Sequence, residues 1–153
     1  MKTRLFQTEQ WLPRRRDEVF PFFADAGNLE AITPPWVNFH IITPRPIQLR
    51  PGALIDYRLR IRGVPVRWRT EITVWEPPHR FVDQQIRGPY RRWHHTHAFE
   101  PQTRGGVEGT LCRDIVEYAV PFDWLAHGLL VRPDIERIFA YRRQTLDRLF
   151  PPR

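Results

Sequence analysis

The chain has 153 residues, of which 41% are hydrophobic and 13% aromatic, and its formal net charge is +7. This length fits one domain with a buried core, and the apolar content excludes a disordered chain. No apolar run approaches the roughly 20 residues of a membrane span, so we expect no integral membrane association. The first residues contain no apolar signal-peptide core, and the single cysteine, Cys112, excludes an internal disulfide. We therefore predict one cytoplasmic domain, residues 1–153.

Arginine supplies nearly all of the positive charge, because Lys2 is the only lysine. A basic surface can attract nucleic acid, and the arginines within Leu54–Arg69 are the candidates for such contacts. The arginines are scattered along the chain, however, and are not gathered on one helix face. We therefore expect no nucleic-acid partner, although a basic contact surface stays as an alternative.

The N-terminal third alternates between strands and short helices. The four elements predicted here, in chain order, are the strand Thr3–Leu12, the helices Arg14–Ala24 and Asn28–Ile32, and the strand Asn38–Thr43. Apolar residues recur at helical spacing in the first helix. Pro21 falls inside that helix, so we expect a kink there.

Five strands and one long helix are predicted for the rest of the chain. The strands are Leu54–Arg62, Val64–Trp75, Phe81–Arg87, Arg91–Glu100 and Thr110–Val120. Apolar residues alternate with charged ones in the first of them, which indicates one buried face and one exposed face. After Pro133, apolar residues recur at helical spacing as far as Leu149, which predicts the longest helix of the chain.

An antiparallel sheet with one apolar face needs a cover, and only the C-terminal helix is long enough to provide it. The predicted fold is therefore α+β. A curved antiparallel sheet of about seven strands wraps around the long C-terminal helix, with two short helices after the first strand. Such a wrap leaves space between sheet and helix, and a space lined by aromatic residues is suited to small apolar ligands.

Four stretches of the sequence resemble one known superfamily. They are Asp17–Trp36, Arg80–Glu100, Asp114–Phe122 and the C-terminal helix IERIFAYRRQTLDRLF. Together with the order of elements, they resemble the START/birch-pollen-allergen superfamily, also called SRPBCC or helix-grip. Within it they are similar to the bacterial ligand-binding branch described as polyketide cyclase/dehydrase-like or cell-division-inhibitor-like. The resemblance implies the fold and a ligand cavity, but it does not specify the chemistry, because this scaffold carries binders and enzymes alike.

The histidine-rich stretch RRWHHTHAFE has the period of a strand. Trp93, His95, His97 and Phe99 share one face, which the aromatic residues identify as the inner one, and His94 then points to solvent. The same parity turns Asp83 of the preceding strand and Asp114 of the following strand inward.

A short turn at Gly88–Tyr90 predicts the register of the strands on either side of it. It places Gln85 opposite Trp93, Asp83 opposite His95 and Phe81 opposite His97, while a turn near Gly105 places His97 opposite Asp114. Two cross-strand Asp–His pairs result. We expect each pair to raise the pKa of the histidine and to lower that of the aspartate.

Three roles are open for His95, His97, Asp83 and Asp114. They can be buried polar residues that satisfy one another and fix the strand register. They can bind the polar end of a mostly apolar ligand. They can also act in catalysis, or bind a metal as a two-histidine, one-carboxylate site. No nucleophilic serine or cysteine accompanies them, so we assign no catalytic residue, no metal and no cofactor, and keep the four as catalytic candidates.

The predicted ligand-binding residues are mostly inward-facing and aromatic. They are Trp36, Tyr57, Trp68, Phe81, Asp83, Gln85, Trp93, His95, His97, Asp114, Tyr118, Phe139 and Arg142. Arg142 interrupts the apolar stripe of the last helix. We favour an interpretation in which its head reaches water, and the alternative is that it points inward to a ligand carboxylate or an aspartate. The segment Pro121–Arg132 is apolar for a connection and is a candidate lid or dimer surface.

Two classes of function follow from these residues. The first is binding of a small hydrophobic or aromatic molecule, such as a lipid, a polyketide or a quinone-like compound, by a monomer or homodimer. The second is a cyclase, dehydratase or hydrolase that uses a cavity His/Asp pair as general base.

Overall fold

The computed structural model describes residues 2–122 and 127–153. The strands are β1 (Arg4–Leu12), β2 (His40–Ile41), β3 (Leu54–Ile61), β4 (Val64–Glu76), β5 (Arg80–Arg87), β6 (Arg92–Arg104) and β7 (Val107–Ala119). The helical elements are α1 (Arg16–Phe23), the short turns η1 (Ala26–Leu29), η2 (Pro35–Val37) and η3 (His127–Val131), and the long helix α3 (Arg132–Leu149). This order confirms the one predicted. The candidate lid Pro121–Arg132 lies partly outside the described residues.

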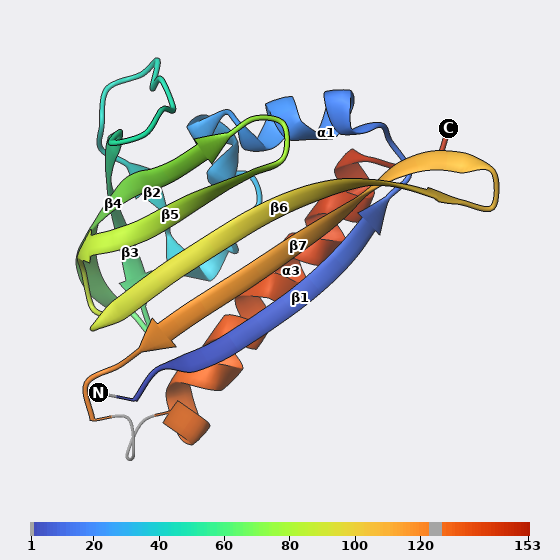
Figure 1. The fold of residues 1–153 in the computed structure, drawn as a ribbon. Helices are drawn as coiled ribbons and strands as arrows, with labels where there is room; N and C mark the ends of the chain where they lie inside the picture. Colours follow the sequence, from blue (N-terminus) through green and yellow to red (C-terminus); the bar gives the residue numbers. More distant parts are fainter. Residues whose placement is uncertain (1, 123–126) are drawn as a thin grey trace.

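The described strands form one antiparallel sheet of seven strands in the order β1-β7-β6-β5-β4-β3-β2. Figure 1 shows the curved sheet with α3 lying behind β1, β7 and β6, and with α1 near one end of the sheet. The predicted helix-grip fold is therefore confirmed. It follows from the one-faced strands and from the single helix that is long enough to cover them.

Several predicted boundaries are wrong for local reasons. The predicted helix Asn28–Ile32 is replaced by the single turn η1, where the Asp25 side chain accepts a hydrogen bond from the Gly27 amide at 2.9 Å. The predicted strand Asn38–Thr43 shortens to β2, because Asn38 adopts a left-handed conformation with φ 49°. β6 and β7 extend beyond the prediction, since the positive φ of Gly105 and Gly106 allows a tight turn between them.

The core is divided into three clusters, and this division leaves a space. One cluster packs Ile135 and Phe139 of α3 against Phe6, Val116 and Tyr118. A second packs Leu146 of α3 against side chains of β1, α1, β5 and β6. The third lies on β3 and β4 and contains no described residue of α3. The sheet therefore curves away from α3 at β3 and β4, and the inner faces of these elements do not meet there.

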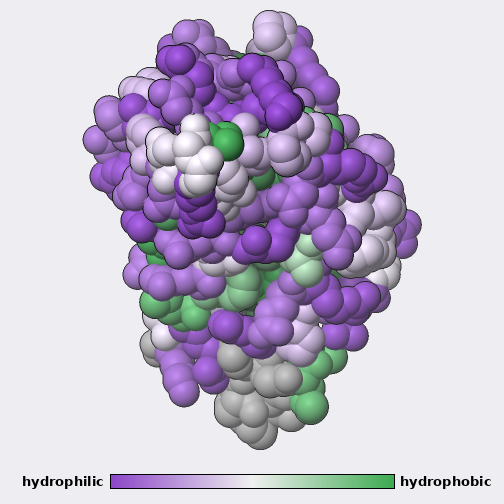
Figure 2. Space-filling model, turned by 90° about the vertical axis from the view of Figure 1, so that its right-hand side faces the viewer, coloured by the Kyte–Doolittle hydropathy of each residue, from purple (hydrophilic) through white to green (hydrophobic). Residues whose placement is uncertain are grey.

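One face of the molecule is largely hydrophilic (Figure 2). Figure 2 shows this mostly hydrophilic face with smaller, separate areas of hydrophobic surface. This agrees with the charged outer positions of the strands. None of the described helices is long and apolar enough to cross a membrane.

The absence of a side chain at Gly109 lets Trp11 cross β7. A Cβ atom at residue 109 would lie 2.4 Å from the indole ring of Trp11. This ring cannot move freely, because its Nε1 donates a hydrogen bond to the carbonyl of Gln102 on β6 at 2.8 Å. Trp11 thus ties β1 to β6 over β7 and supports the register of the strands that carry the inward histidines.

We predict that Gly109→Ala lowers the free energy of unfolding by about 1–3 kcal/mol, since the indole must shift and lose its hydrogen bond. Urea unfolding measures this change. The matched control, Val107→Ala, truncates an exposed residue of the same hairpin and should change stability by less than about 0.5 kcal/mol. Equal stabilities of Gly109→Ala and the wild type would contradict the prediction.

Candidate functional site

A cavity of about 460 Å³ lies between the sheet and α3, next to the β3–β4 cluster. Its wall consists mainly of aliphatic and aromatic side chains from η2, β3, β4, β6 and α3. The predicted site residues that line it are Trp36, Tyr57, Trp68, Asp83, Trp93, His95, Phe139 and Arg142. The parity argument that turned the inner faces of β3, β4, β5 and β6 toward α3 therefore places most of this wall correctly.

Five predicted site residues do not line this cavity. Phe81 and His97 line a separate hollow of about 60 Å³, and Asp83 and Arg142 line both spaces. Gln85, Asp114 and Tyr118 are not among the described lining residues of either space. The Gln85 side chain instead bridges the backbone of Tyr90, Asp114 lies behind His95, and Tyr118 is fully buried in the core.

The sequence analysis missed other parts of the wall. Leu59 and Ile61 continue the inward alternation of β3, and the same period-2 pattern could have identified them. Tyr90 also lines the cavity, but it lies in the β5–β6 turn, where no periodicity predicts the direction of a side chain. Arg62 and Asp134 line it as well, and their distance in the sequence gave no signal that they meet.

Two contacts between distant segments border the cavity. The half-exposed Trp36 packs edge-on against Tyr141, with ring centroids 5.9 Å apart, and lies 5.3 Å from the guanidinium of Arg137. Arg62, at the tip of the β3–β4 hairpin, forms a two-pronged ion pair with Asp134 at 3.0 and 3.2 Å. Both contacts join α3 to the opposite wall, so they hold the two sides of the cavity together.

The predicted strand register is largely confirmed. Asp83 is paired with His95, Phe81 with His97, and His97 with Asp114. The predicted pairing of Gln85 with Trp93 is absent from the described ladder, which ends at Gln84 and His94. The backbone alignment of the three strands therefore places two histidines between two aspartates, as the parity of the strands indicates.

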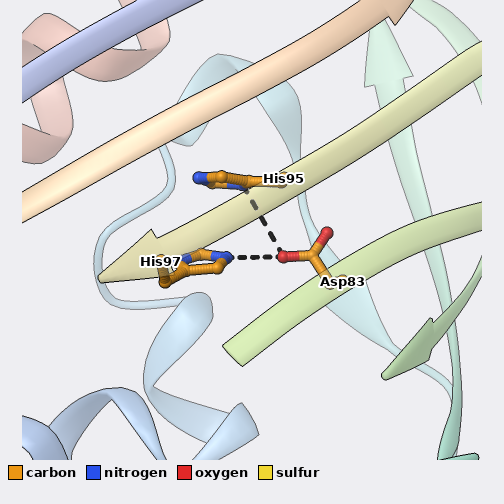
Figure 3. Close-up of side chains that lie close together, drawn as sticks. All are labelled: Asp83, His95 and His97. Carbon is orange, nitrogen blue, oxygen red and sulfur yellow. Dashed lines mark hydrogen bonds and ion pairs between the residues drawn. The ribbon is translucent and has the colours of Figure 1, made fainter. Parts of the chain in front are cut away.

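The hydrogen bonds run diagonally and not directly across the ladder. His97 Nε2 lies 2.5 Å from Asp83 Oδ2, and His95 Nε2 lies 2.8 Å from Asp114 Oδ1. Figure 3 shows both imidazoles directed toward the Asp83 carboxylate. Both predicted direct pairs are present as ion pairs, but the shorter hydrogen bonds join the diagonal partners. Diagonal neighbours on adjacent strands are within reach of long side chains. The directly opposed pairs, His95 with Asp83 and His97 with Asp114, lie farther apart, at 3.6 Å.

The two imidazoles form a buried stack. Their ring centroids lie 3.7 Å apart, and Phe81 stacks on the outer face of His97 at 4.2 Å. The residues His95 and His97 are only 5% and 6% exposed. His94, as predicted, belongs to the other face of the strand, where it contacts Glu117.

Burial and charge set the protonation of this cluster. Burial alone would raise the pKa of Asp83, but the charge of His95 and the hydrogen bond from His97 outweigh it and lower that pKa. Burial likewise opposes ionisation of Asp114, but the charge of Arg142 and the hydrogen bond from His95 lower the pKa of this carboxyl group. Burial, together with the charge of His95, lowers the pKa of His97 to about 4. The expectation that pairing raises the pKa of this histidine is therefore wrong, because desolvation of the imidazolium is the larger effect.

Arg142 fixes the tautomer of His97. Its Nη2 lies 3.5 Å from His97 Nδ1 and 3.5 Å from Asp114 Oδ1. A guanidinium can only donate, so His97 accepts at Nδ1 and donates from Nε2 to Asp83. Arg142 is itself only 7% exposed. The favoured interpretation that its head reaches water is wrong, and the alternative that it pairs with an inward aspartate is correct.

Asp83, His95 and His97 are also the described residues with the best geometry for a metal ion, since their ligand atoms lie within 4.8 Å of one another. A metal would have to displace the proton between His97 and Asp83, which are only 2.5 Å apart. It would also lie near the fixed positive charge of Arg142. The arrangement fits a hydrogen-bonded cluster better than a metal centre. Cys112 offers no alternative nucleophile, because burial raises its pKa to about 12.

We predict that the folded protein loses stability as pH falls from about 6.5 to about 4. In this window the unfolded chain protonates His97, whose ordinary pKa is 6.5, while the folded chain keeps it neutral. Acid therefore favours unfolding, by about 1–3 kcal/mol across the window. The two aspartates have pKa values lowered from 3.8, so their protonation destabilises the fold only below this pH window.

The variant His97→Gln keeps a donor for Asp83 but has no titrating ring. The loss of unfolding free energy between about pH 6.5 and pH 4, which is the slope of stability against pH, should therefore disappear. Urea unfolding at several pH values measures it. His94→Gln removes a histidine of the same strand outside the buried cluster and should keep the wild-type slope. If His97→Gln keeps that slope too, His97 is not the group responsible.

Comparison with known proteins places this architecture in a family. Residues 12–146 match the family model described as polyketide cyclase/dehydrase and lipid transport. No curated protein sequence matches the chain.

Solved structures of START and birch-pollen-allergen type have the same fold. Major latex-like protein 151 of Panax ginseng is 10% identical, with a TM-score of 0.69 over 98% of this chain and 99% of that one. A START superfamily protein of Mycobacterium smegmatis is 12% identical, with a TM-score of 0.66 over 95% and 98%. A norcoclaurine synthase mutant of Thalictrum flavum is 14% identical, with a TM-score of 0.65 over 95% and 94%. The fold and the family match agree: the chain belongs to the polyketide cyclase/dehydrase and lipid transport family of the SRPBCC superfamily.

Proposed function

We propose that residues 1–153 form one binding domain for a small, mainly hydrophobic molecule of aromatic or fused-ring character, such as a polyketide or a quinone-like compound. The observation that carries this proposal is the cavity of about 460 Å³ between sheet and α3, which has an apolar wall and a polar cluster at one place. Its size falls in the range of small-molecule sites, about 300–1,000 Å³.

The shape of the wall favours a flat ring system over a flexible chain. Trp68 meets Trp93 edge-on at 5.5 Å and Tyr90 at 5.6 Å, so the rings hold one another in fixed orientations. Rigid aromatic walls lose little conformational entropy on binding and offer extended faces for stacking. A lipid chain would gain apolar contact as well, but it would lose more conformational freedom on entering.

Structural neighbours of the same fold support a ligand-binding role. The Thalictrum flavum norcoclaurine synthase was solved in complex with a transition state analogue. The family description includes both cyclase/dehydrase activity and lipid transport. Because these functions share one scaffold, the residues of this cavity must decide which of them applies to this chain.

The binding proposal predicts that the neutral dye N-phenyl-1-naphthylamine binds the protein with a gain in fluorescence. Ile138 lines the cavity from α3, so Ile138→Trp fills the space and should weaken binding at least about tenfold. Leu149→Trp adds the same bulk at an exposed position of the same helix and should bind as the wild type does. A folded Ile138→Trp variant with wild-type affinity would exclude this cavity as the site.

A second candidate function is proton transfer at a carbon atom, and one contact favours it. His95 lines the cavity while its Nε2 is held by Asp114 at 2.8 Å. An imidazole oriented by a buried carboxylate is the arrangement of a general base. In this candidate, His95 removes a proton from the carbon next to a ligand carbonyl, and Arg142 stabilises the enolate that forms.

Deuterium exchange tests this second candidate without knowledge of the natural substrate. The methyl protons of bound 2-acetylnaphthalene should exchange with D₂O faster in the presence of the protein, as followed by NMR. His95→Gln should remove at least about 100-fold of the acceleration, which is typical of a lost general base. His94→Gln serves as the control. Exchange no faster than in imidazole buffer would leave binding as the function.

A further inference from the structure

The guanidinium of Arg142 is buried, and its hydrogen-bonding capacity is not filled by the described residues. It lies between the rings of Phe23 and Phe139, at 5.5 and 5.6 Å from their centroids. Its Nη2 approaches polar atoms of Asp114 and His97, both at 3.5 Å. Within residues 2–122 and 127–153, Nε has no hydrogen-bond partner. A buried arginine with an unused donor is costly, unless a further acceptor is bound.

The histidine contacts of Asp83 involve only one of its two carboxylate oxygens. Its Oδ2 receives both histidine contacts, from His97 at 2.5 Å and from His95 at 3.6 Å. Figure 3 shows the other oxygen turned away from the two rings. No residue in the described part of the chain hydrogen-bonds this oxygen, although Asp83 lines the cavity. Asp83 therefore offers an acceptor to whatever fills the space.

These two groups contact the two nitrogens of the same imidazole ring, Asp83 at His97 Nε2 and Arg142 at His97 Nδ1. Asp83 and Arg142 both line the main cavity and the smaller hollow behind it, so they form the partition between the two spaces. One is an acceptor and the other a donor. A ligand that satisfies both must present a hydrogen-bond donor and an acceptor within a short distance of each other at the same end of an apolar body.

We infer that the ligand carries a hydroxyl group and a nearby carbonyl oxygen, with the hydroxyl donating to Asp83 and the carbonyl accepting from Arg142. This inference rests on the proposed binding function and specifies its ligand as a hydroxyaryl ketone or a related hydroxy-carbonyl compound. A carboxylate ligand would place a negative charge beside Asp83, and an amine would place a positive charge beside Arg142. A neutral hydroxyl–carbonyl pair complements both residues and leaves the charge of the cluster unchanged.

Four naphthalene probes test the inference on the wild-type protein by displacement of N-phenyl-1-naphthylamine. They are naphthalene, 2-acetylnaphthalene with the acceptor alone, 1-naphthol as the phenol, and an acetylnaphthol with its hydroxyl meta to the acetyl group. Each hydrogen bond to a charged residue should improve affinity about tenfold, so the acetylnaphthol should bind about 100-fold more tightly than naphthalene.

Two conservative variants assign each preference to its residue. Asp83→Asn should abolish most of the gain from the hydroxyl and keep the gain from the acetyl group. Arg142→Lys keeps the positive charge beside Asp114 but lacks the planar donors, so it should abolish most of the gain from the acetyl group. Arg148→Lys, on the exposed side of the same helix, is the matched control and should keep both preferences. Near-UV circular dichroism verifies that each variant is folded.

The outcomes separate this inference from the proposed function. If the dye and naphthalene bind but all four probes bind alike, the cavity is a binding site and the hydroxy-carbonyl inference is wrong. If folded Arg142→Lys keeps the full preference for the acetyl group, the assignment to Arg142 is wrong. If neither the dye nor any probe binds, the proposed function and this inference fail together. The wild-type series alone decides the matter should a variant not fold.

Discussion

The structure depends on the neutralisation of two buried carboxylates beneath the sheet. Asp83 on β5 and Asp114 on β7 lie in an interior where an unpaired charge would cost several kcal/mol. The two stacked histidines of β6 lie between them, and Arg142 of α3 adds the positive charge. Because the five side chains come from three strands and one helix, their pairing fixes the register of β5, β6 and β7. It also fixes the rotation of α3 against the sheet.

The same cluster decides where the interior is solid and where it is hollow. On one side of it, α3 packs directly on β1 and β7 through Phe139 and Ile135. On the other side, the sheet curves away with β3 and β4, and no described residue of α3 joins their core cluster. Polar groups at this boundary can form hydrogen bonds with one another on the core side and still line the cavity on the other side. The position of the cavity is thus a consequence of how the buried charges are paired.

Strand parity predicted much of this arrangement, since the period of a strand determines which face a residue occupies. It identified His95, His97, Asp83 and Asp114 as inward residues and gave the correct backbone pairs. It could not predict the diagonal hydrogen bonds, which depend on side-chain rotamers. Nor could it show that Asp114 lies behind His95 and outside the cavity wall, because the alternation of residues along a strand does not reveal which inward side chain covers another.

Helix periodicity failed at one informative position. Arg142 occupies the buried face of α3, where an amphipathic pattern predicts an apolar residue. A local conflict of this kind is expected where a residue serves a function or pairs with a distant charge. The partner, Asp114, is remote in the sequence, and only the assembled sheet shows that the two meet.

The structural and functional atoms of the cluster are separable. His97 contacts Asp83 and Arg142 through its two ring nitrogens, and Asp114 contacts His95 and Arg142. Neither His97 nor Asp114 lines the main cavity, so substitutions there act first on stability. Asp83 and Arg142 both line the cavity, and the described chain provides no hydrogen-bond partner for Nε of Arg142. A buried polar atom without a partner destabilises the fold, and the proposed ligand would offset this cost by adding hydrogen bonds to the cluster. The polar groups of such a ligand would continue the network that holds the sheet and α3 together, and binding would stabilise the folded state.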